Sequence, residues 1–573
     1  ASPNKRAKMR GRHGLRFVPA LTLLALIGPV AAGLIGTLLP AFGYLPAAGL
    51  SDWGFAAFRE LLAWPGFSAS MRLSLSTGLI ATAISLGIVT MVLAGWQGTP
   101  AFRWIERMLS PLLSVPHAAA AFGIAFLIAP SGWVVRLISP WATGWERPPD
   151  ILILQDPAGI AMIIGLVVKE VPFLLLMSLA ALGQSDANRS LLAARTLGYG
   201  RVTGWLMVVF PQVYRQIRLP VFVVLVFSMS VVDVAIILGP NTPNTLSVQI
   251  VRWMSDPDLA LRLRAAAAAV AQLGLVIGAL LVWRLGEAIV ATLARRFLAA
   301  GGRGAGLDRV RWVSAGAISL IALALFAGLA GLALWSFAGF WSYPNALPDQ
   351  LLMRSWMRHG PNLLGPLGST ALIAVLAAAI ALILTVGCLE AEHRHGVKMR
   401  RAGAFLLYLP LLIPQTAFLP GLQTLMLSAG LQSGLWPVVL AHVVFVLPYV
   451  FLSLADPFRA WDTRLDIAAR SMGVSADGVL WRVRLPMLLA PVLTALAVGL
   501  AVSVGQYLPT LLVGGGRVQT LTTEAVALAS GGDRRAIGIY GLAQTLAALL
   551  PFAAAVLVPR LIWRNRREMQ HDG

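Results

Sequence analysis

The stretch LLAARTLGYGRVTGWLMVVFP, from Leu191 to Pro211, returns in similar form as DIAARSMGVSADGVLWRVRLP, from Asp466 to Pro486. The two copies align without gaps at a constant shift of 275 positions, so that Gly198 matches Gly473 and Pro211 matches Pro486. The other matched residues are Ala193, Ala194, Arg195 and Thr196 in the first copy and Ala468, Ala469, Arg470 and Ser471 in the second. Each copy is a polar, arginine-bearing interruption between long apolar runs. Because the stretch occurs twice, we expect it to bind a partner outside the membrane, and not only to connect two spans.

The composition indicates an all-α polytopic membrane protein. Of the 573 residues, 58% are hydrophobic and only 12% are charged, and the mean hydropathy is +0.78. Apolar runs of about 20 residues recur, the length that a helix needs to cross a bilayer. The formal net charge of +21 comes from short basic clusters between these runs, as the positive-inside rule expects. No basic stretch alternates with stacking aromatic residues, so we expect a lipid bilayer and no nucleic acid as a partner.

The apolar runs predict about 12 transmembrane helices in two halves of six. In the first half they lie near 16–39, 71–95, 108–129, 157–182, 215–239 and 265–293, and in the second near 312–338, 366–389, 402–428, 434–455, 485–512 and 536–563. The Gly- and Arg-rich segment 299–311 reads as a flexible cytoplasmic linker. It divides the chain into a first transmembrane domain, 1–298, and a second, 312–573.

The basic clusters predict that both termini are cytoplasmic. A basic leader precedes the first span. The apolar run of this span is too long for the hydrophobic region of an ordinary signal peptide, so we expect it to stay uncleaved. The leader contains Lys5, Arg6, Lys8, Arg10, Arg12 and Arg16, and the C-terminal tail contains Arg564, Arg566 and Arg567. Two stretches on the expected outer side, 252–264 and 354–359, carry basic residues against the rule.

The two halves match beyond the repeated stretch. Thr245-Leu246-Ser247 corresponds to Thr520-Leu521-Thr522 at the same shift of 275. Less regular matches are Val115-Pro116 with Ile413-Pro414, Ser76-Thr77 with Ser369-Thr370, and Val171-Pro172-Phe173 with Leu447-Pro448-Tyr449. Because both halves start on the same side, the repeats are parallel and should be related by an axis along the membrane normal.

The repeated stretch itself predicts a helix, a turn, a second helical piece and then a span. Ala, Arg, Leu and Met favour helix, and Gly198 and Gly473 stand where a C′ glycine would end it. Pro211 and Pro486 stand where the next span begins, a position that tolerates the missing N–H. A cytoplasmic turn without a partner is the alternative for one copy, but two copies with identical spacing disfavour it.

This pattern resembles the "EAA" loop of the permease subunits of binding-protein-dependent ABC importers: Glu-Ala-Ala, three residues, Gly, nine residues, Ile-x-Leu-Pro. Val483, Leu485 and Pro486 fill the last positions in one copy, as Val208, Phe210 and Pro211 do in the other. The family's Glu is replaced by Leu192 and Ile467, and Asp466 stands one position early.

The resemblance covers essentially the whole chain and implies a type I importer permease in a bacterial inner membrane. Its partners would be two ATP-binding cassette subunits, docked on the two loops, and an extracytoplasmic solute-binding protein. Fused permeases of this size resemble the thiamine and ferric-iron group; polyamines and sulfate-like anions stay open.

Polar residues inside the apolar runs are candidates for a translocation path, because such groups are costly in a membrane. They are Lys169, Glu170, Asp233, Gln506 and Tyr507. Interhelical hydrogen bonding is the alternative and weighs about equally for Asp233. Lys169 and Glu170 are adjacent on a helix, so each should have its own partner. For these two residues a structural ion-pair network is at least as strong an explanation as a substrate contact. For His442 we favour a structural hydrogen-bonding role.

Several functional classes are disfavoured. None of the four lysines follows a P-loop glycine pattern, so ATP must bind to another chain. The single cysteine, Cys388, allows no disulfide within the chain, and no spacing predicts a metal site, a cofactor or a catalytic group. A gradient-driven secondary transporter with 12 spans is the main alternative, but it gives no reason for the repeated loop.

Overall fold

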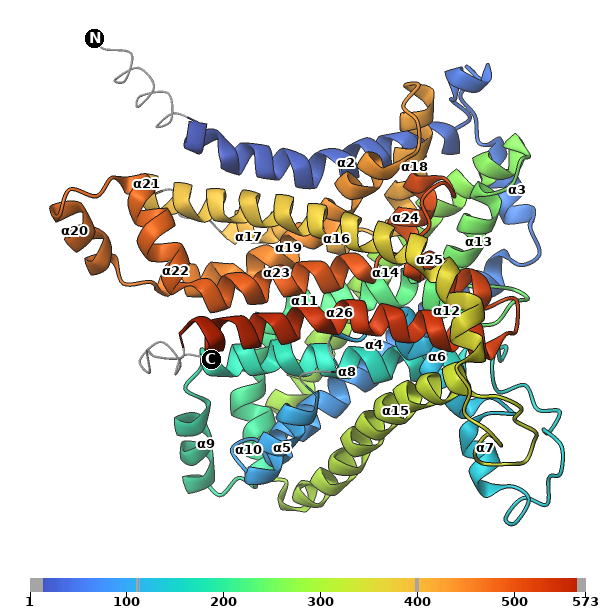
Figure 1. The fold of residues 1–573 in the computed structure, drawn as a ribbon. Coiled ribbons are helices and arrows are strands. Elements are labelled where there is room, and N and C mark those ends of the chain that lie inside the picture. Colours follow the sequence, from blue (N-terminus) through green and yellow to red (C-terminus); the bar gives the residue numbers. More distant parts are fainter. Residues whose placement is uncertain (1–13, 110–111, 113, 397–400, 564–573) are drawn as a thin grey trace, which may run out of the picture.

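The computed structural model of the protein describes residues 14–109, 112, 114–396 and 401–563. Within these ranges the chain is helical, with only two isolated β-bridges, Leu45 with Leu50 and Ala338 with Leu351. In the same part of the chain, ten helices are long and apolar enough to cross a membrane, and twelve if each of two bent pairs counts as one span. The fold is therefore the expected polytopic helical one (Figure 1). The predicted leader residues from Lys5 to Arg12 and the tail from Arg564 to Arg567 lie outside the described ranges.

The elements follow the same order in both halves. In the first half they are η1 (Leu15–Phe17), α2 (Val18–Ala41), η2 (Pro46–Ala48), α3 (Ala56–Ala63), α4 (Phe67–Trp96), α5 (Pro100–Leu109), α6 (His117–Ile128), α7 (Trp133–Ile138), α8 (Ile160–Gly183), α9 (Ala187–Thr196), α10 (Arg201–Gly204), η4 (Trp205–Val209), α11 (Phe210–Ser230), α12 (Asp233–Leu238), α13 (Leu246–Met254) and α14 (Leu259–Ala299). After η5 (Ala305–Val310), the second half contains α15 (Arg311–Phe337), α16 (Arg354–His395), α17 (Arg401–Leu412), α18 (Gln415–Ser428), α19 (Leu435–Ala460), α20 (Thr463–Ser471), α21 (Ala476–Val479), η6 (Leu480–Arg484), α22 (Leu485–Met487), α23 (Leu489–Val504), α24 (Leu508–Gly514), α25 (Leu521–Leu528) and α26 (Arg534–Ile562).

The third and ninth spans are not the single straight helices that hydropathy predicts. α6 begins after Pro116, and α18 begins after Pro414 with a bend of 84° relative to the preceding helical segment. A proline lacks the N–H that would continue the helix and disfavours helical geometry in the residue before it. The prolines that the sequence comparison matched thus stand directly before the helices α6 and α18, and a bend is present at Pro414.

The internal duplication is visible in repeated hydrogen bonds. The Leu246 N–H donates to Ser74 Oγ over 3.0 Å, and the Leu521 N–H donates to Thr370 Oγ1 over 2.9 Å. The shift of 275 between Leu246 and Leu521 is confirmed. The structure pairs Thr370 with Ser74, however, and not with Thr77 as the sequence match had it. Hydropathy fixes a helix only to within a turn, and the contact made by the side chain decides the register.

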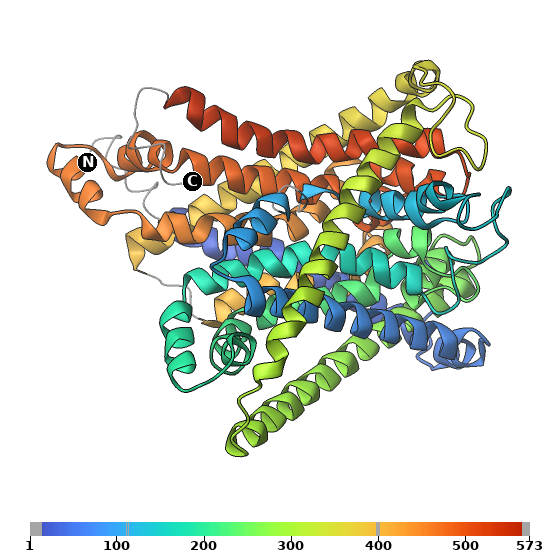
Figure 2. The ribbon, with the colours of Figure 1, turned by 90° about the horizontal axis from the view of Figure 1, so that it is seen from below.

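The first span of each half packs against the other half. α2 lies against α18, and α15 lies against α6; Figure 2 shows α15, in yellow-green, running obliquely across helices of the first half. Both crossings are made by glycines. A Cβ on Gly123 would lie 2.9 Å from the carbonyl carbon of Gly328, and a Cβ on Gly421 would collide with the carbonyl oxygen of Gly33. Small residues let helix backbones approach closely in membranes, so these glycines fix how the halves interlock.

The repeated stretches lie at the same end of the helix bundle, where α9 and α20 project beyond it (Figure 1). We call this the loop end.

Two residues of the stretches that break the charge rule lie near carboxylates, at the end expected to face outward. Arg264 Nη2 lies 3.1 Å from Glu60 Oε2, and His359 Nε2 lies 3.8 Å from Asp533 Oδ2. Pairing with Glu60 lowers the cost of the Arg264 charge on that side.

Candidate functional site

The two repeated loops, residues 187–209 and 463–484, have the same backbone. α9 and α20 each end at a glycine in the left-handed region, Gly198 with φ +82° and Gly473 with φ +85°. The Gly198 N–H donates to the Arg195 carbonyl over 3.0 Å, and the Tyr199 N–H donates to the Ala194 carbonyl over 3.2 Å. Gly473 and Val474 repeat these bonds at 2.9 and 3.1 Å. This pair of bonds is the Schellman motif, so the predicted C′ role of both glycines is confirmed.

A short helical turn, α10 or α21, follows each glycine and leads into a π-helical segment, η4 or η6, at the same shift of 275. Pro211 then stands near the start of α11, and Pro486 lies in α22, where the chain bends by 79° into α23. Segments of π-helix are rare and often found at functional sites. The predicted order of helix, turn, helical piece and span is therefore present in both loops.

The two alanines of each loop point in different directions. Ala193 and Ala468 are exposed, whereas Ala194 and Ala469 are buried. In the first loop, a Cβ on Gly204 would lie 3.2 Å from the Ala194 Cβ, so the buried alanine is a close contact within the loop. Only the first alanine of each pair is available to a partner.

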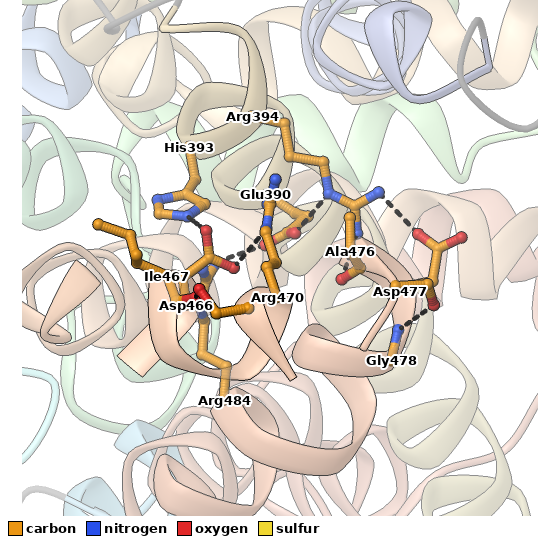
Figure 3. Close-up of polar contacts among 12 residues, drawn as sticks. Glu390, His393, Arg394, Asp466, Ile467, Arg470, Ala476, Asp477, Gly478 and Arg484 are labelled. Carbon is orange, nitrogen blue, oxygen red and sulfur yellow. Dashed lines mark hydrogen bonds and ion pairs between the residues drawn. The ribbon is translucent and has the colours of Figure 1, made fainter. Parts of the chain in front are cut away.

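The positions that lack the family's Glu are open to solvent. Leu192 is 61% exposed and Ile467 is 65% exposed. Asp466 does not take over the missing charge at the surface: its side chain is only 13% exposed, and its Oδ1 accepts a hydrogen bond of 3.0 Å from Arg470 Nε. Figure 3 shows Asp466 turned toward His393 of α16 and Arg470. Asp466 therefore holds the loop to the bundle.

A buried ion network anchors the second loop (Figure 3). Glu390 of α16 lies between two arginines, 2.5 Å from Arg484 Nη1 and 2.6 Å from Arg394 Nε. The Arg484 side chain is 2% exposed, and its guanidinium also stacks on Trp461 at 4.3 Å. Arg394 continues to Asp477 at 2.6 Å. α16 and the segment after α20 are thus joined by charge, through a Glu390–Arg484 pair shielded from water and through Asp477, whose side chain is 80% exposed.

The first loop is anchored differently, by neutral groups of α4 and by the linker between the halves. Trp205 Nε1 donates to Gln97 Oε1 over 2.7 Å, next to the end of α4. From the linker, Asp308 Oδ1 accepts the Val202 N–H over 2.9 Å, and Arg303 stacks on the Tyr199 ring at 4.5 Å. The sequence reads the linker as flexible; in the structure it contains η5 and is bound to the first loop.

Sequence reasoning missed both anchors. Arg394 and Arg484 read only as basic residues of cytoplasmic connections, and Asp308 reads as part of a spacer. The sequence does contain one sign of the second anchor: Arg484 stands at the position where the first repeat has the apolar Val209. A charge that replaces an apolar residue in a matched position indicates a buried partner, here Glu390.

The candidates for a translocation path lie around breaks in the fifth and eleventh spans. α11 ends at Ser230 and α12 begins at Asp233, while α23 ends at Val504 and α24 begins at Leu508. Gln506 and Tyr507 lie in the second break. Irregular backbone inside a membrane is tolerated where it is covered by protein or lines a cavity, and transporters place substrate sites at such broken helices. The matched breaks favour a path over simple bundle contacts.

Glu170 and Lys169 have separate partners, as expected for neighbours on a helix. Glu170 Oε1 lies 3.4 Å from Nε2 of His117, the first residue of α6. Lys169 Nζ donates to the Leu112 carbonyl over 3.4 Å. His117 begins α6, and α6 also contacts α12, which begins at the buried Asp233.

Asp233 lies at the contact between the halves. It begins α12, and α12 contacts α25 of the second half. Tyr507 stands in the break between α23 and α24. His442 has a structural role, as the sequence suggested: it bridges Ser503 Oγ at 2.8 Å and Thr510 Oγ1 at 2.9 Å.

Comparisons with known proteins place this geometry in a family. Residues 384–564 match the family described as "Binding-protein-dependent transport system inner membrane component". The inner membrane ABC transporter permease protein YnjC of Escherichia coli (strain K12) is 30% identical over 563 residues, 97% of this chain and 99% of that protein. The spermidine/putrescine transport system permease PotC of Haemophilus influenzae is 25% identical over 34% of this chain and 74% of its own length. A permease of Salmonella typhimurium named for a 2-aminoethylphosphonate transport system, PhnV, is 28% identical over 34% of this chain and 77% of its own length. The chain belongs to the inner-membrane permease subunits of binding-protein-dependent ABC transporters.

Proposed function

We propose that this permease moves a small organic solute with a cationic nitrogen into the cell. Two copies of an ATP-binding subunit dock on the two repeated loops, and an extracytoplasmic binding protein delivers the solute to the opposite end. The loop end and both termini are then cytoplasmic. Residues 1–298 and 312–573 act as the two transmembrane domains, each completed by the first span of the other.

The observation that carries the docking proposal is the pair of matched loops at one end of the bundle. Both loops repeat the same glycine geometry, the same π-helical segment and the same exposed positions. A pseudo-twofold pair of projecting helices fits a partner that binds as two equal subunits.

The anchors suggest how motion reaches the membrane. When ATP draws the two ATP-binding subunits together, the loops follow. The first loop pulls on α4 through Gln97 and Trp205, and the second pulls on α16 through Glu390 and Arg484. Because packed interfaces have discrete alternative arrangements, a small displacement of the loops becomes a rotation of one half against the other.

The solute class rests on two buried carboxylates. Glu170 of α8 and Asp233 of α12 are 4% and 6% exposed, and buried carboxylates suit an ammonium or a quaternary nitrogen. Two of the relatives are named for amine-containing compounds, spermidine/putrescine and 2-aminoethylphosphonate. Thiamine-like compounds carry a cationic nitrogen too and stay within the proposed class.

A valine at the C′ glycine of a loop tests the docking proposal. Nothing lies within 4 Å of a Cβ on Gly473, so Gly473→Val acts only through the left-handed backbone, which costs an L-residue about 1–2 kcal/mol. We expect the loop to lose its Schellman turn and the ATP-binding subunit to co-purify in reduced amount. Gly183→Val is the control, since this glycine at the end of α8 has open space but no left-handed φ. Equal recovery of the ATP-binding subunit with both variants would refute the docking role.

Removing one carboxylate tests the solute proposal. In proteoliposomes that contain the permease, its ATP-binding subunit and its binding protein, we expect Asp233→Asn to lower uptake about tenfold or more. Size-exclusion chromatography should show an unchanged complex. Putrescine, spermidine, thiamine, 2-aminoethylphosphonate, ferric iron and sulfate are compared as labelled solutes. Uptake of sulfate, which has no cationic nitrogen, by the wild type, or full uptake of putrescine or spermidine by the variant, would contradict the proposed class.

A further inference from the structure

The surface that the loops offer to a partner has an unusual chemistry. On α9, Arg189, Leu192, Ala193 and Thr196 are spaced by three or four residues and share one helix face. On α20, Arg464, Ile467, Ala468 and Ser471 occupy the same positions at the shift of 275. All of them are exposed. We call these eight residues the docking stripe.

The stripe is apolar at its centre and basic at one end. Leu192 and Ile467 are more than half exposed, and beyond the stripe Leu197 and Met472, at 65% and 78%, extend the apolar surface past each helix end. These side chains lie outside every described helix that is long and apolar enough to cross a membrane. Exposed apolar groups that recur in both halves mark a surface for a protein partner.

No carboxylate belongs to the stripe. Asp466 lies on the neighbouring face of α20 and is held by Arg470. Asp186 and Asp462 precede the two helices. Asp462 accepts the Arg464 N–H over 2.9 Å and its Oδ1 lies 3.9 Å from Arg464 Nε, but the Arg464 side chain stays 91% exposed. The charge that each stripe presents outward is therefore positive.

We propose that each docking stripe fits an ATP-binding subunit whose docking cleft is apolar and carries carboxylates on its rim. This inference rests on the proposed docking function and defines the partner that the loops accept. The apolar side chains fill the cleft, and Arg189 and Arg464 pair with its acidic rim. An ATP-binding subunit with a basic rim is rejected by like charge, which gives the specificity of pairing.

Charge changes on the stripe test the inference. The dissociation constant between the detergent-solubilised permease and its ATP-binding subunit is measured for the wild type and four double variants. Leu192→Glu/Ile467→Glu and Arg189→Glu/Arg464→Glu should each weaken binding about tenfold or more. Arg103→Glu/Arg107→Glu is the matched control, because these arginines are exposed on α5, outside the stripe, and carry the same charge change. The control should bind as the wild type does.

The outcomes separate the two proposals. If the wild type binds the ATP-binding subunit and Leu192→Glu/Ile467→Glu binds equally well or better, the acidic, apolar cleft is wrong while docking on the loops stands. If the wild type shows no binding, the proposed function fails first. All changed side chains are exposed, so the variants should elute as the wild type does in size-exclusion chromatography, and Leu192→Met/Ile467→Met, which keeps the apolar character, should retain wild-type affinity.

Discussion

Glu390→Gln will destabilise the permease strongly and uncouple the second loop from α16. The carboxylate lies between Arg484 and Arg394, and the Glu390 and Arg484 side chains are 3% and 2% exposed. Removing one partner of a buried ion pair leaves an uncompensated charge and costs about 3–5 kcal/mol. We expect a lower midpoint of thermal unfolding in detergent and loss of uptake, with the first loop still able to bind its ATP-binding subunit.

The double variant Glu390→Gln/Arg484→Met separates charge from shape. When both charges are removed and volume is kept, the cost is small in many proteins, so the double variant should be more stable than Glu390→Gln alone. Glu392→Gln is the control: its partner Arg459 has a side chain that is 41% exposed, and such surface pairs contribute about 1 kcal/mol or less. A double variant less stable than Glu390→Gln would show that Arg484 stabilises the protein through its aromatic contacts instead.

Gly421→Val will prevent the two halves from assembling correctly. The new Cβ would collide with the Gly33 carbonyl oxygen and the Thr37 backbone nitrogen. Backbone atoms of a packed helix cannot move aside as a flexible side chain can, and overpacking of this kind costs about 1–3 kcal/mol or more. We expect a large fall in the yield of monodisperse permease from the membrane.

Gly278→Val in α14 is the matched control for this variant. It makes the same substitution inside a long helix, but nothing lies within 4 Å of its Cβ. A similar yield for the two variants would mean that the loss of helix propensity, and not the crossing of α2 and α18, limits assembly.

The sequence predicts most of what is repeated in this protein. The two loops can be recognised because their sequences align without gaps. A glycine at the helix end and a proline at a fixed distance after it restrict the backbone conformation between them. Leu246 and Leu521 could be matched for the same reason. The number of apolar runs gave the number of spans, since the length of a membrane helix is set by the bilayer. The repeated loop favoured a permease over a secondary transporter, and the family assignment agrees.

The sequence does not predict how the spans meet. Hydropathy averages over a window and shows neither the break at Pro116 nor the bend at Pro414. The packing of α2 against α18 depends on backbone contacts at Gly33 and Gly421, and the sequence does not distinguish these glycines from other small residues. The Glu390 network was missed because Arg484 and Asp477 lie more than eighty positions from their partners on α16, and each reads as an ordinary boundary charge.

The exchange of first spans imposes an order on biosynthesis. α2 is made early, but its packing partner α18 begins only at Gln415. At the usual 5–20 residues per second, the ribosome needs roughly 20 to 75 seconds to produce the chain between them. During this time α2 must rest in lipid without the helix that will cover Gly33. A chain that stops translation after the first half would still pack α2 against α14, but the face of α2 that carries Gly33 would stay without its partner until the ninth span is inserted.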